Sequence, residues 1–367
     1  MSLLRCAKLM RPRASMVGPY ARRCGGRLSR FKTHVLNKER QLLSEEIASS
    51  ADLSEDEPPT PSSSGLNAAG ILFDEDHVRV WSPELVLYTP LGFLLAAFRS
   101  ALWILGIALD QPWFRNQSIV GTYMRLLGVT VIWRHAERIP IGRHVMVSNH
   151  CSVGDLMMLF SHPSLPQRYT HLITSALPAQ VTRARHLPVI MRPASPATYD
   201  ELASTLDPSP VHLFPEGGMT NGRGMLRFSR GFMRILQQQQ QQQNLCHVQQ
   251  EHVEQLPASQ QGGISSAVAA TVATLPVVPV ALRVNSSLSG VKTHTLNSSF
   301  LANLFWFGFS PRTTLEATVL PPMFPAPGEA RGAFVVRVQA AIAKELDVEV
   351  YEMTIQQKRM LAGRKRA

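Results

Sequence analysis

The stretch His144-Val145-Met146-Val147-Ser148-Asn149-His150-Cys151-Ser152-Val153-Gly154-Asp155 decides the fold that the sequence predicts. Residues 144–148 are short, apolar and rich in β-branched side chains, which predicts a buried β-strand. Residues 155–160 follow as a predicted helix. This order brings His150 to the end of the strand and returns Asp155 to within about one helical turn of it.

Similar short apolar runs recur along the chain at residues 129–133, 187–191, 211–214 and 275–284. Amphipathic, helical stretches are predicted at 111–127 and 332–346. Strands that alternate with helices are typical of an α/β fold with helices packed on a sheet. We therefore expect the α/β class.

The pair His150 and Asp155 suits acid–base chemistry. A neutral imidazole can take a proton from a hydroxyl group, while a carboxylate on its other nitrogen fixes the tautomer and stabilises the imidazolium. The nucleophile would then be a hydroxyl of the substrate. The spacing fits another interpretation equally well, in which Asn149 or Ser152 caps the helix and Asp155 lies in its first turn.

A second candidate element is the turn Phe214-Pro215-Glu216-Gly217 at the end of a predicted strand. Ligands of open α/β sheets bind at this edge, and glycine allows the backbone to approach them closely. Arg192 closes another predicted strand, where a guanidinium suits phosphate binding. Each has a simple alternative, an ordinary turn for the first and a solvated arginine for the second.

The order and spacing of these elements resemble the glycerolipid acyltransferase family, whose members acylate glycerol phosphate and lysophospholipids. Its NHxxxxD block matches Asn149, His150 and Asp155, and its FPEG block matches 214–217. Residues 186–192 correspond to the GxxFxxR block and 277–280 to a final hydrophobic block with proline. This resemblance covers roughly residues 120–325.

Within the family, the sequence is similar to the ancient ubiquitous protein subfamily of lipid-droplet and endoplasmic-reticulum proteins. Residues 87–92, 220–229 and 334–346 carry that likeness, which extends over about 85–355. The subfamily usually continues into a Cue domain that binds the ubiquitin system, whereas the sequence given stops at Ala367. We therefore expect little role in protein degradation.

The resemblance implies a glycerol-phosphate acyltransferase-like sheet with flanking helices and an acyl-CoA-dependent O-acyltransferase mechanism. His150 would be the general base and Asp155 its orienting group, with acyl-CoA as co-substrate and without a cofactor or metal. The resemblance assigns substrate binding to a further set of residues: Asn149, Arg192, Phe214, Pro215, Glu216, Gly217 and Arg223.

Two departures from the family pattern leave an alternative open. His186 and Val189 replace the glycine and phenylalanine of the second block, and Met219 stands where many members have an arginine. Arg223 is a candidate to compensate. The alternative is a non-catalytic scaffold of the ancient ubiquitous protein type that organises lipid droplets or assists protein degradation.

Residues 85–109 form the strongest membrane signal, with Arg99 as the single charge. The segment is long enough to cross a bilayer, but a charge beyond its middle is costly there. Four arrangements stay open: a membrane hairpin that keeps Arg99 near the headgroups, an interfacial helix, a full span, or a buried helix of a soluble protein.

The remaining regions have simpler predicted roles. Residues 1–66 are predicted to be a disordered region, first basic and then acidic and rich in Ser and Pro, and 237–266 a disordered Gln-rich insertion. The acyltransferase-like domain would then occupy 115–350 and a basic tail 351–367. The first 38 residues lack Asp and Glu, which fits either a tail on anionic lipid or a transit peptide to a plastid or mitochondrion.

Composition narrows the class of protein. The chain of 367 residues has a formal net charge of +11 but only 17% charged residues. It has no zinc spacing, aromatic RNA-binding signature or sustained basic helix face, so we expect no nucleic-acid partner. The four cysteines lack CxxC spacing and favour a reducing, cytosol-facing environment. We expect membrane lipid and acyl-CoA as partners, at the endoplasmic reticulum or lipid droplet, and the sequence identifies no protein partner.

Overall fold

The computed structural model describes residues 63–161, 168–174, 186–205, 208–236, 275–326 and 328–364. All of them belong to the second of two units, residues 56–367. The predicted insertion at 237–266 lies outside the described residues, as does most of the predicted disordered region 1–66. The last residues of that region are helical instead, since α2 runs from Ser63 to Leu72.

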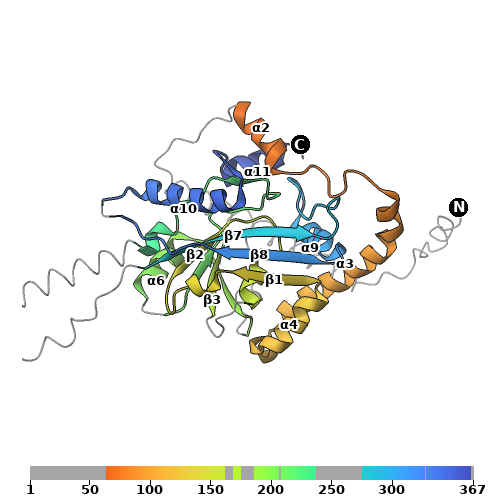
Figure 1. Cartoon of the computed structure of the whole chain (residues 1–367), viewed down its shortest axis with the longest axis horizontal. Helices are drawn as coiled ribbons and strands as arrows, with labels where there is room; N and C mark the ends of the chain where they lie inside the picture. The colour runs from red at the N-terminus through yellow and green to blue at the C-terminus, as the bar shows by residue number, and fades with distance from the viewer. Residues whose placement is uncertain are drawn as a thin grey trace, which may run out of the picture. The chain divides into compact units, whose positions relative to one another are not determined.

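A seven-stranded mixed sheet forms the centre of this unit, in the order β1-β8-β7-β2-β5-β3-β4 (Figure 1). The strands are β1 (Val129–Arg134), β2 (Val145–Ser148), β3 (Tyr169–Ile173), β4 (Val189–Pro193), β5 (Val211–Leu213), β7 (Val277–Ser286) and β8 (Thr313–Val319). All neighbours are parallel except β7 and β8. The predicted α/β class and the five predicted strands are confirmed, while β3 and β8 were not predicted.

The helices follow the predicted pattern in part. They are α3 (Pro83–Leu109), η2 (Pro112–Arg115), α4 (Gln117–Leu126), η3 (Ala136–Arg138), η4 (Asp155–Ser161), α6 (Pro196–Ser204), α9 (Phe300–Phe309), α10 (Arg331–Leu346) and α11 (Ile355–Arg364). The predicted helix 332–346 is confirmed as α10. The predicted helix 111–127 is instead split, because the Asn116 side chain accepts hydrogen bonds from the first N–H groups of α4.

Two hydrophobic cores cover the two faces of the sheet. In β2, Met146 joins the core that contains α4 and η4, whereas Val145 and Val147 join the core that contains α6 and α10. This alternation follows from the two-residue period of a strand. All four residues of β2 are buried because the strand lies near the middle of a parallel region with helices on both faces.

The segment expected in the membrane is one uninterrupted helix, α3, so the predicted hairpin is wrong. Its Arg99 is also placed differently from the prediction, since it is buried against protein. The guanidinium donates hydrogen bonds to the carbonyls of Leu126, Gly308, Ser310 and Pro311. These bonds fix the middle of α3 to the ends of α4 and α9, and α9 packs along α3.

Residues 351–364, predicted to be a basic tail, instead fold onto the domain. Strand β9 (Glu349–Tyr351) pairs in parallel with β6 (Gly224–Leu226), and α11 follows it. The prediction failed because the segment is polar, with Lys358 and Met353 as its few buried side chains. Figure 1 shows α10 and α11 on the same side of the main sheet.

Candidate active site

The structure brings His150 and Asp155 into direct contact. His150 follows β2 at the carboxyl edge of the sheet, and its Nδ1 lies 3.0 Å from Asp155 Oδ2. The Asp155 carboxylate is fully buried and the His150 side chain is 20% exposed. Because a carboxylate only accepts, we assign the proton to Nδ1, which leaves Nε2 as the acceptor.

The capping interpretation also holds for the same carboxylate. Asp155 Oδ2 accepts hydrogen bonds from the backbone N–H groups of Cys151 (2.7 Å) and Ser152 (2.9 Å). Ser152 Oγ in turn accepts from Gly154 N. The two interpretations of the spacing are therefore compatible, since the turn that Asp155 stabilises is the one that presents His150.

Phe214 fixes the plane of the His150 ring. The two rings are stacked, with centroids 4.1 Å apart and an interplanar angle of 6°. Phe214 comes directly after β5, the strand next to β2, so adjacent strand ends place the rings together. The backbone of His150 is held as well, because Thr220 N donates a hydrogen bond to His150 O.

Glu216 holds the backbone of the site. Its Oε1 accepts from His150 N at 2.7 Å, and its Oε2 accepts from Leu226 N at 2.8 Å. Burial raises the pKa of this carboxyl, and these two bonds together with the charge of Lys358 oppose the rise. Glu216 therefore links the strand that carries His150 to β6.

The two glycines of the turn make room for α11. Gly217 has φ +68° and Gly218 lies so close to Ile355 that an added Cβ would be 2.4 Å from its Cδ1. The sequence suggested that Gly217 leaves space for a ligand, whereas the space beside this turn is filled by Ile355. Pro215 contributes through its carbonyl, which accepts from Ser229 N.

Asn149 joins β2 to β7 beyond the end of the regular ladder. Its Nδ2 donates to Leu282 O at 2.9 Å, and its Oδ1 accepts from Leu282 N at 2.7 Å. This side chain is 3% exposed. The contacts indicate a structural role for Asn149, next to the dyad.

The two arginines assigned to the substrate make ion pairs elsewhere. Arg192 pairs with Glu201, and Arg223 pairs with Asp74. Arg192 lies on β4, three strands from β2, which is roughly 14 Å at the usual strand spacing. The structure therefore brings together the NHxxxxD and FPEG blocks but not Arg192, whereas Arg223 pairs with Asp74 and directly follows Gly222, which lies next to Cys151.

Several buried polar groups near the dyad were not among the candidate residues that the sequence predicted. Ser148 Oγ lies 2.9 Å from His212 Nε2, and His212 Nδ1 lies 2.8 Å from His171 Nδ1. Both imidazoles also contact Phe214 edge-on. A histidine within the apolar run 211–214 could have pointed to this network.

Cys151 follows His150 but is not suited to attack a substrate. Its thiol is buried, and burial together with the nearby Asp155 raises its pKa well above the usual range. The thiol is therefore neutral at physiological pH and a poor nucleophile.

A cavity of about 320 Å³ lies beside the site, at the carboxyl end of β7. Cys151, Gly222, Arg283, Lys292 and His294 are among its lining residues. Among the described residues, no cluster of three or more His, Cys, Asp or Glu side chains has the arrangement of a metal site.

Comparison with known proteins places these features in context. A family model described as "Acyltransferase" matches residues 130–283. "Lipid droplet-regulating VLDL assembly factor AUP1" of Homo sapiens is 26% identical over 273 residues, covering 71% of this chain and 55% of that protein. The Rattus norvegicus and Mus musculus proteins of the same name match equally. The chain thus spans about half the length of these curated relatives.

A solved structure is also similar, the 1-acyl-sn-glycerophosphate acyltransferase PlsC from Thermotoga maritima. The match has a TM-score of 0.43 and 12% sequence identity, and it covers 70% of this chain and 96% of that one.

Proposed function

We propose that the chain, whose residues 130–283 match the acyltransferase family model and which is similar to AUP1 proteins, transfers an acyl group from acyl-CoA to a lipid hydroxyl. The proposed acceptor is a lysophospholipid or glycerol phosphate. The contact between His150 Nδ1 and the buried Asp155 carboxylate is the observation that carries the proposal.

The proposed reaction uses His150 Nε2 as general base. As the acceptor oxygen attacks the thioester carbonyl, its proton passes to Nε2 and the imidazolium is stabilised by Asp155. The C–O bond forms, the C–S bond breaks, and the proton is then available to the leaving CoA thiolate. Attack by the substrate hydroxyl agrees with the neutral, buried thiol of Cys151.

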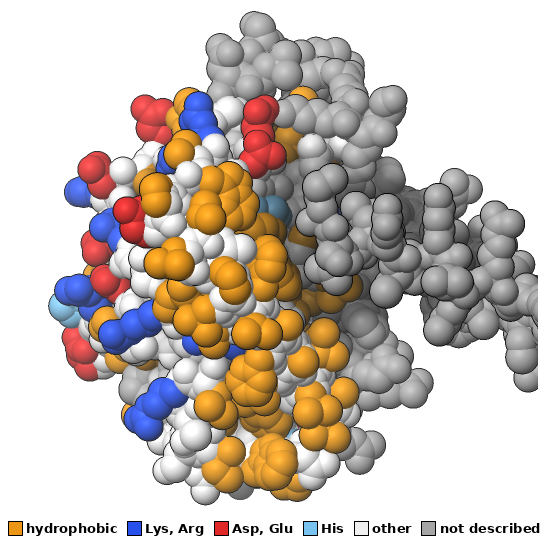
Figure 2. Space-filling view, turned by 90° about the vertical axis from the view of Figure 1, so that its right-hand side faces the viewer, with side chains coloured by type: hydrophobic (Ala, Val, Ile, Leu, Met, Phe, Trp, Pro, Cys, Tyr) orange, Lys and Arg blue, Asp and Glu red, His pale blue; other side chains and the backbone are white. Residues whose placement is uncertain are grey.

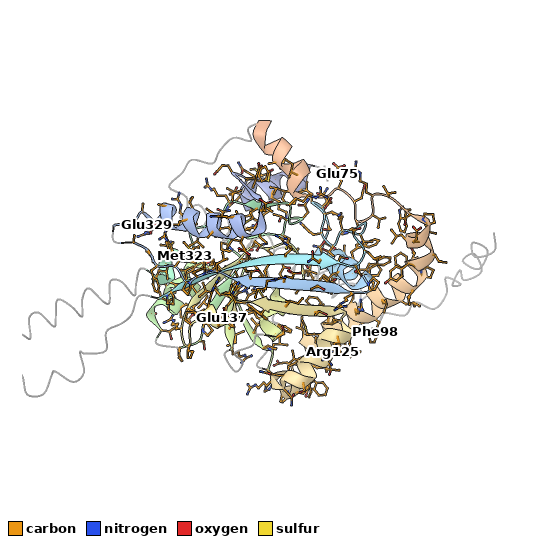
Figure 3. All side chains as sticks on the ribbon, viewed as in Figure 1. Glu75, Phe98, Arg125, Glu137, Met323 and Glu329 are labelled. Carbon is orange, nitrogen blue, oxygen red and sulfur yellow. The ribbon has the colours of Figure 1, made fainter. Side chains whose placement is uncertain are left out.

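The proposed membrane contact is an apolar surface made by α3 and α9. Figure 2 shows hydrophobic side chains gathered on this side of the molecule. Large exposed apolar residues of these two helices are Val86, Leu87, Leu91, Phe93, Leu94, Phe98, Ile104, Leu105, Leu109, Phe300 and Leu301. Phe98 of α3 and Arg125 of α4 lie at the same end of the sheet (Figure 3).

The position of Arg99 favours an interfacial helix over a span. α3 is long and apolar enough to cross a bilayer, but its middle is bound to backbone carbonyls of the domain. A span would draw those elements into the hydrocarbon. An exposed apolar surface with a basic chain suits the face of an endoplasmic-reticulum membrane or lipid droplet, with the dyad on the cytosolic side.

The test uses the full chain reconstituted in phosphatidylcholine vesicles with an acyl-CoA and a panel of lysophospholipids and glycerol 3-phosphate. We expect release of CoA that depends on an acceptor and is lost in His150→Ala. His135→Ala is the matched control, because His135 is exposed and lies outside the site. Equal release from wild-type protein and His150→Ala with every acceptor would refute the proposal.

A second candidate function is a non-catalytic protein of lipid droplets. Two observations favour it. Arg192 is paired with Glu201, and the curated relatives are named as lipid-droplet regulators. Under this alternative, droplet size in cells depends on the apolar face of α3 and not on His150. Replacing Leu87 and Leu94 by Glu would abolish the effect, and His150→Ala would preserve it.

A further inference from the structure

Lys358 is a buried cation next to the candidate site. It lies on α11 and is only 8% exposed. Its Nζ donates to Met219 O at 2.6 Å and to His294 Nε2 at 3.1 Å, and it lies 4.7 Å from the centre of the Phe73 ring. A buried ammonium with this many partners is specifically placed, because burial without them would be costly.

The charge of Lys358 interacts electrostatically with Glu216. Burial lowers the pKa of Lys358 and raises the pKa of Glu216, and each charge opposes the shift of the other. The remaining neighbour, His294, accepts from Lys358 through Nε2 and is neutral, since burial lowers its pKa to about 3. The direct contact of Lys358 with the site is therefore its bond to the carbonyl of Met219.

A continuous set of contacts joins Lys358 to His150. Lys358 holds the carbonyl of Met219, two residues beyond Gly217, while Ile355 of the same helix covers the Gly217–Gly218 backbone. The same turn contains Glu216, which accepts from His150 N. Met219 is also the position where the family pattern has an arginine, so α11 brings a cation to this place from another part of the chain.

We propose that Lys358 is a positioning residue of the active site: through its bond to Met219 O it fixes the Gly217–Met219 turn, and through that turn it holds Glu216 and His150 in place. The part of this inference that concerns turnover rests on the proposed function. The part that concerns the geometry of His150 stands without it.

The experiment compares wild-type chain with Lys358→Met, Lys358→Arg and Gln356→Met in the same vesicles. Lys358→Met keeps the length of the side chain and removes the charge, and Lys358→Arg restores a cation. Gln356→Met adds the same side chain at an exposed position of α11 and is the matched control. The first readout is CoA release, measured as kcat and as KM for acyl-CoA.

The second readout does not need turnover. Diethyl pyrocarbonate modifies neutral imidazoles, and mass spectrometry gives the rate of modification at each histidine. His150 is partly exposed, whereas His171 and His212 are buried and report whether a variant is still folded.

We expect kcat of Lys358→Met to fall by on the order of 10²-fold with little change in KM, because the base is displaced while binding is retained. We also expect a severalfold faster modification of His150, with His171 and His212 still protected. Lys358→Arg should recover most of both properties, and Gln356→Met should match wild type. Unchanged His150 reactivity in folded Lys358→Met would overturn the inference.

The double variant Glu216→Gln/Lys358→Met separates positioning from general destabilisation. If Lys358 acts on His150 through the turn that contains Glu216, the double variant loses less than the two single variants combined. Purely additive losses would count against the role, and this outcome can be read even if Lys358→Met folds poorly. If wild-type protein releases no CoA, the proposed function fails while the modification rates still decide the role of Lys358.

Discussion

At the scale of single residues, Asp155 has two functions that depend on one oxygen atom. Its Oδ2 accepts from the His150 ring and from the N–H groups of Cys151 and Ser152. The turn geometry and the imidazole tautomer are thus set by the same carboxylate. A substitution that preserves the turn but removes the negative charge separates the structural function from the catalytic one.

Asp155→Asn is such a substitution. We expect kcat for CoA release to fall by on the order of 10³ to 10⁴, because the neutral amide no longer stabilises the imidazolium that forms on His150. The thermal midpoint should change far less than in Asp155→Ala, since the amide oxygen can still accept from the backbone. Near wild-type kcat in Asp155→Asn would contradict the role of His150 as base.

Asn149→Asp tests the structural role that the contacts give Asn149. Leu282 O would face a carboxylate oxygen instead of an N–H donor. We expect the free energy of unfolding to fall by about 3 kcal/mol or more, because a buried hydrogen bond is lost and a buried charge is left beside an acceptor. Urea unfolding measures this, and an unchanged midpoint would show that the Asn149–Leu282 pair contributes little.

The motif residues of the site were accessible to sequence reasoning, since His150, Asp155, Phe214 and Glu216 lie in two short blocks. Lys358 was not accessible, because its partners Met219 and His294 are 139 and 64 residues away. A single lysine in a polar segment has no local pattern that distinguishes it from a solvated one.

At the scale of elements, Arg99 fixes the middle of α3 to the domain. Arg99 donates to four backbone carbonyls, and Gly128 leaves room for its guanidinium, which lies 2.4 Å from where a Cβ would be. The sequence predicted the apolar length of this segment correctly. It could not reveal the carbonyl partners, three of which come from α9 and its following turn, about 210 residues away.

Arg99→Met removes these donors at similar side-chain length. We expect the free energy of unfolding to fall by about 3 kcal/mol, since several buried carbonyls lose a charged donor. Urea unfolding in detergent provides the measurement, and protease cleavage between α3 and α4 should become faster. Arg125→Met, an exposed control on α4, should leave both unchanged, and equal behaviour of the two variants would argue against the anchor.

The strands show what a local pattern can and cannot predict. β2 and β7 are apolar runs and were predicted, whereas β8 alternates buried and half-buried residues along its length. Its alternation in the sequence of Thr313–Val319 is the signal that was missed. β3 contains His171 and Thr170, whose burial depends on partners from β5 and so has no local sign.

At the scale of the whole molecule, buried imidazoles make stability depend on pH. Burial lowers the pKa of His144 to about 4 and those of His171 and His294 to about 3, from 6.5, and it lowers the pKa of His212 as well. Between pH 6.5 and 4 the unfolded chain therefore binds more protons than the folded one.

The free energy of unfolding should consequently be highest above pH 6.5 and fall as the pH drops toward 4. Each histidine contributes about 1.4 kcal/mol per pH unit inside its window. The raised pKa of Glu216 has the opposite effect on the free energy of unfolding, because this one group binds its proton more readily in the folded chain than in the unfolded chain. Urea midpoints at pH 7.5, 6 and 5 measure the slope.

Control variants identify the source of that slope. His144→Gln should flatten the slope, whereas His135→Gln should not, because the His135 side chain is exposed. A free energy of unfolding that is constant from pH 7.5 to 5 would be inconsistent with neutral, buried histidines.

The pairing of β6 with β9 has a consequence for biosynthesis. It joins residues 224–226 to residues 349–351, and the bond from Leu226 N to Glu216 depends on the same strand. Closing so long a stretch of chain is slow compared with local folding. A ribosome therefore produces the dyad well before the segment that fixes it, so a nascent chain carries His150 and Asp155 in an unfinished site, which is completed only after α11 has been made.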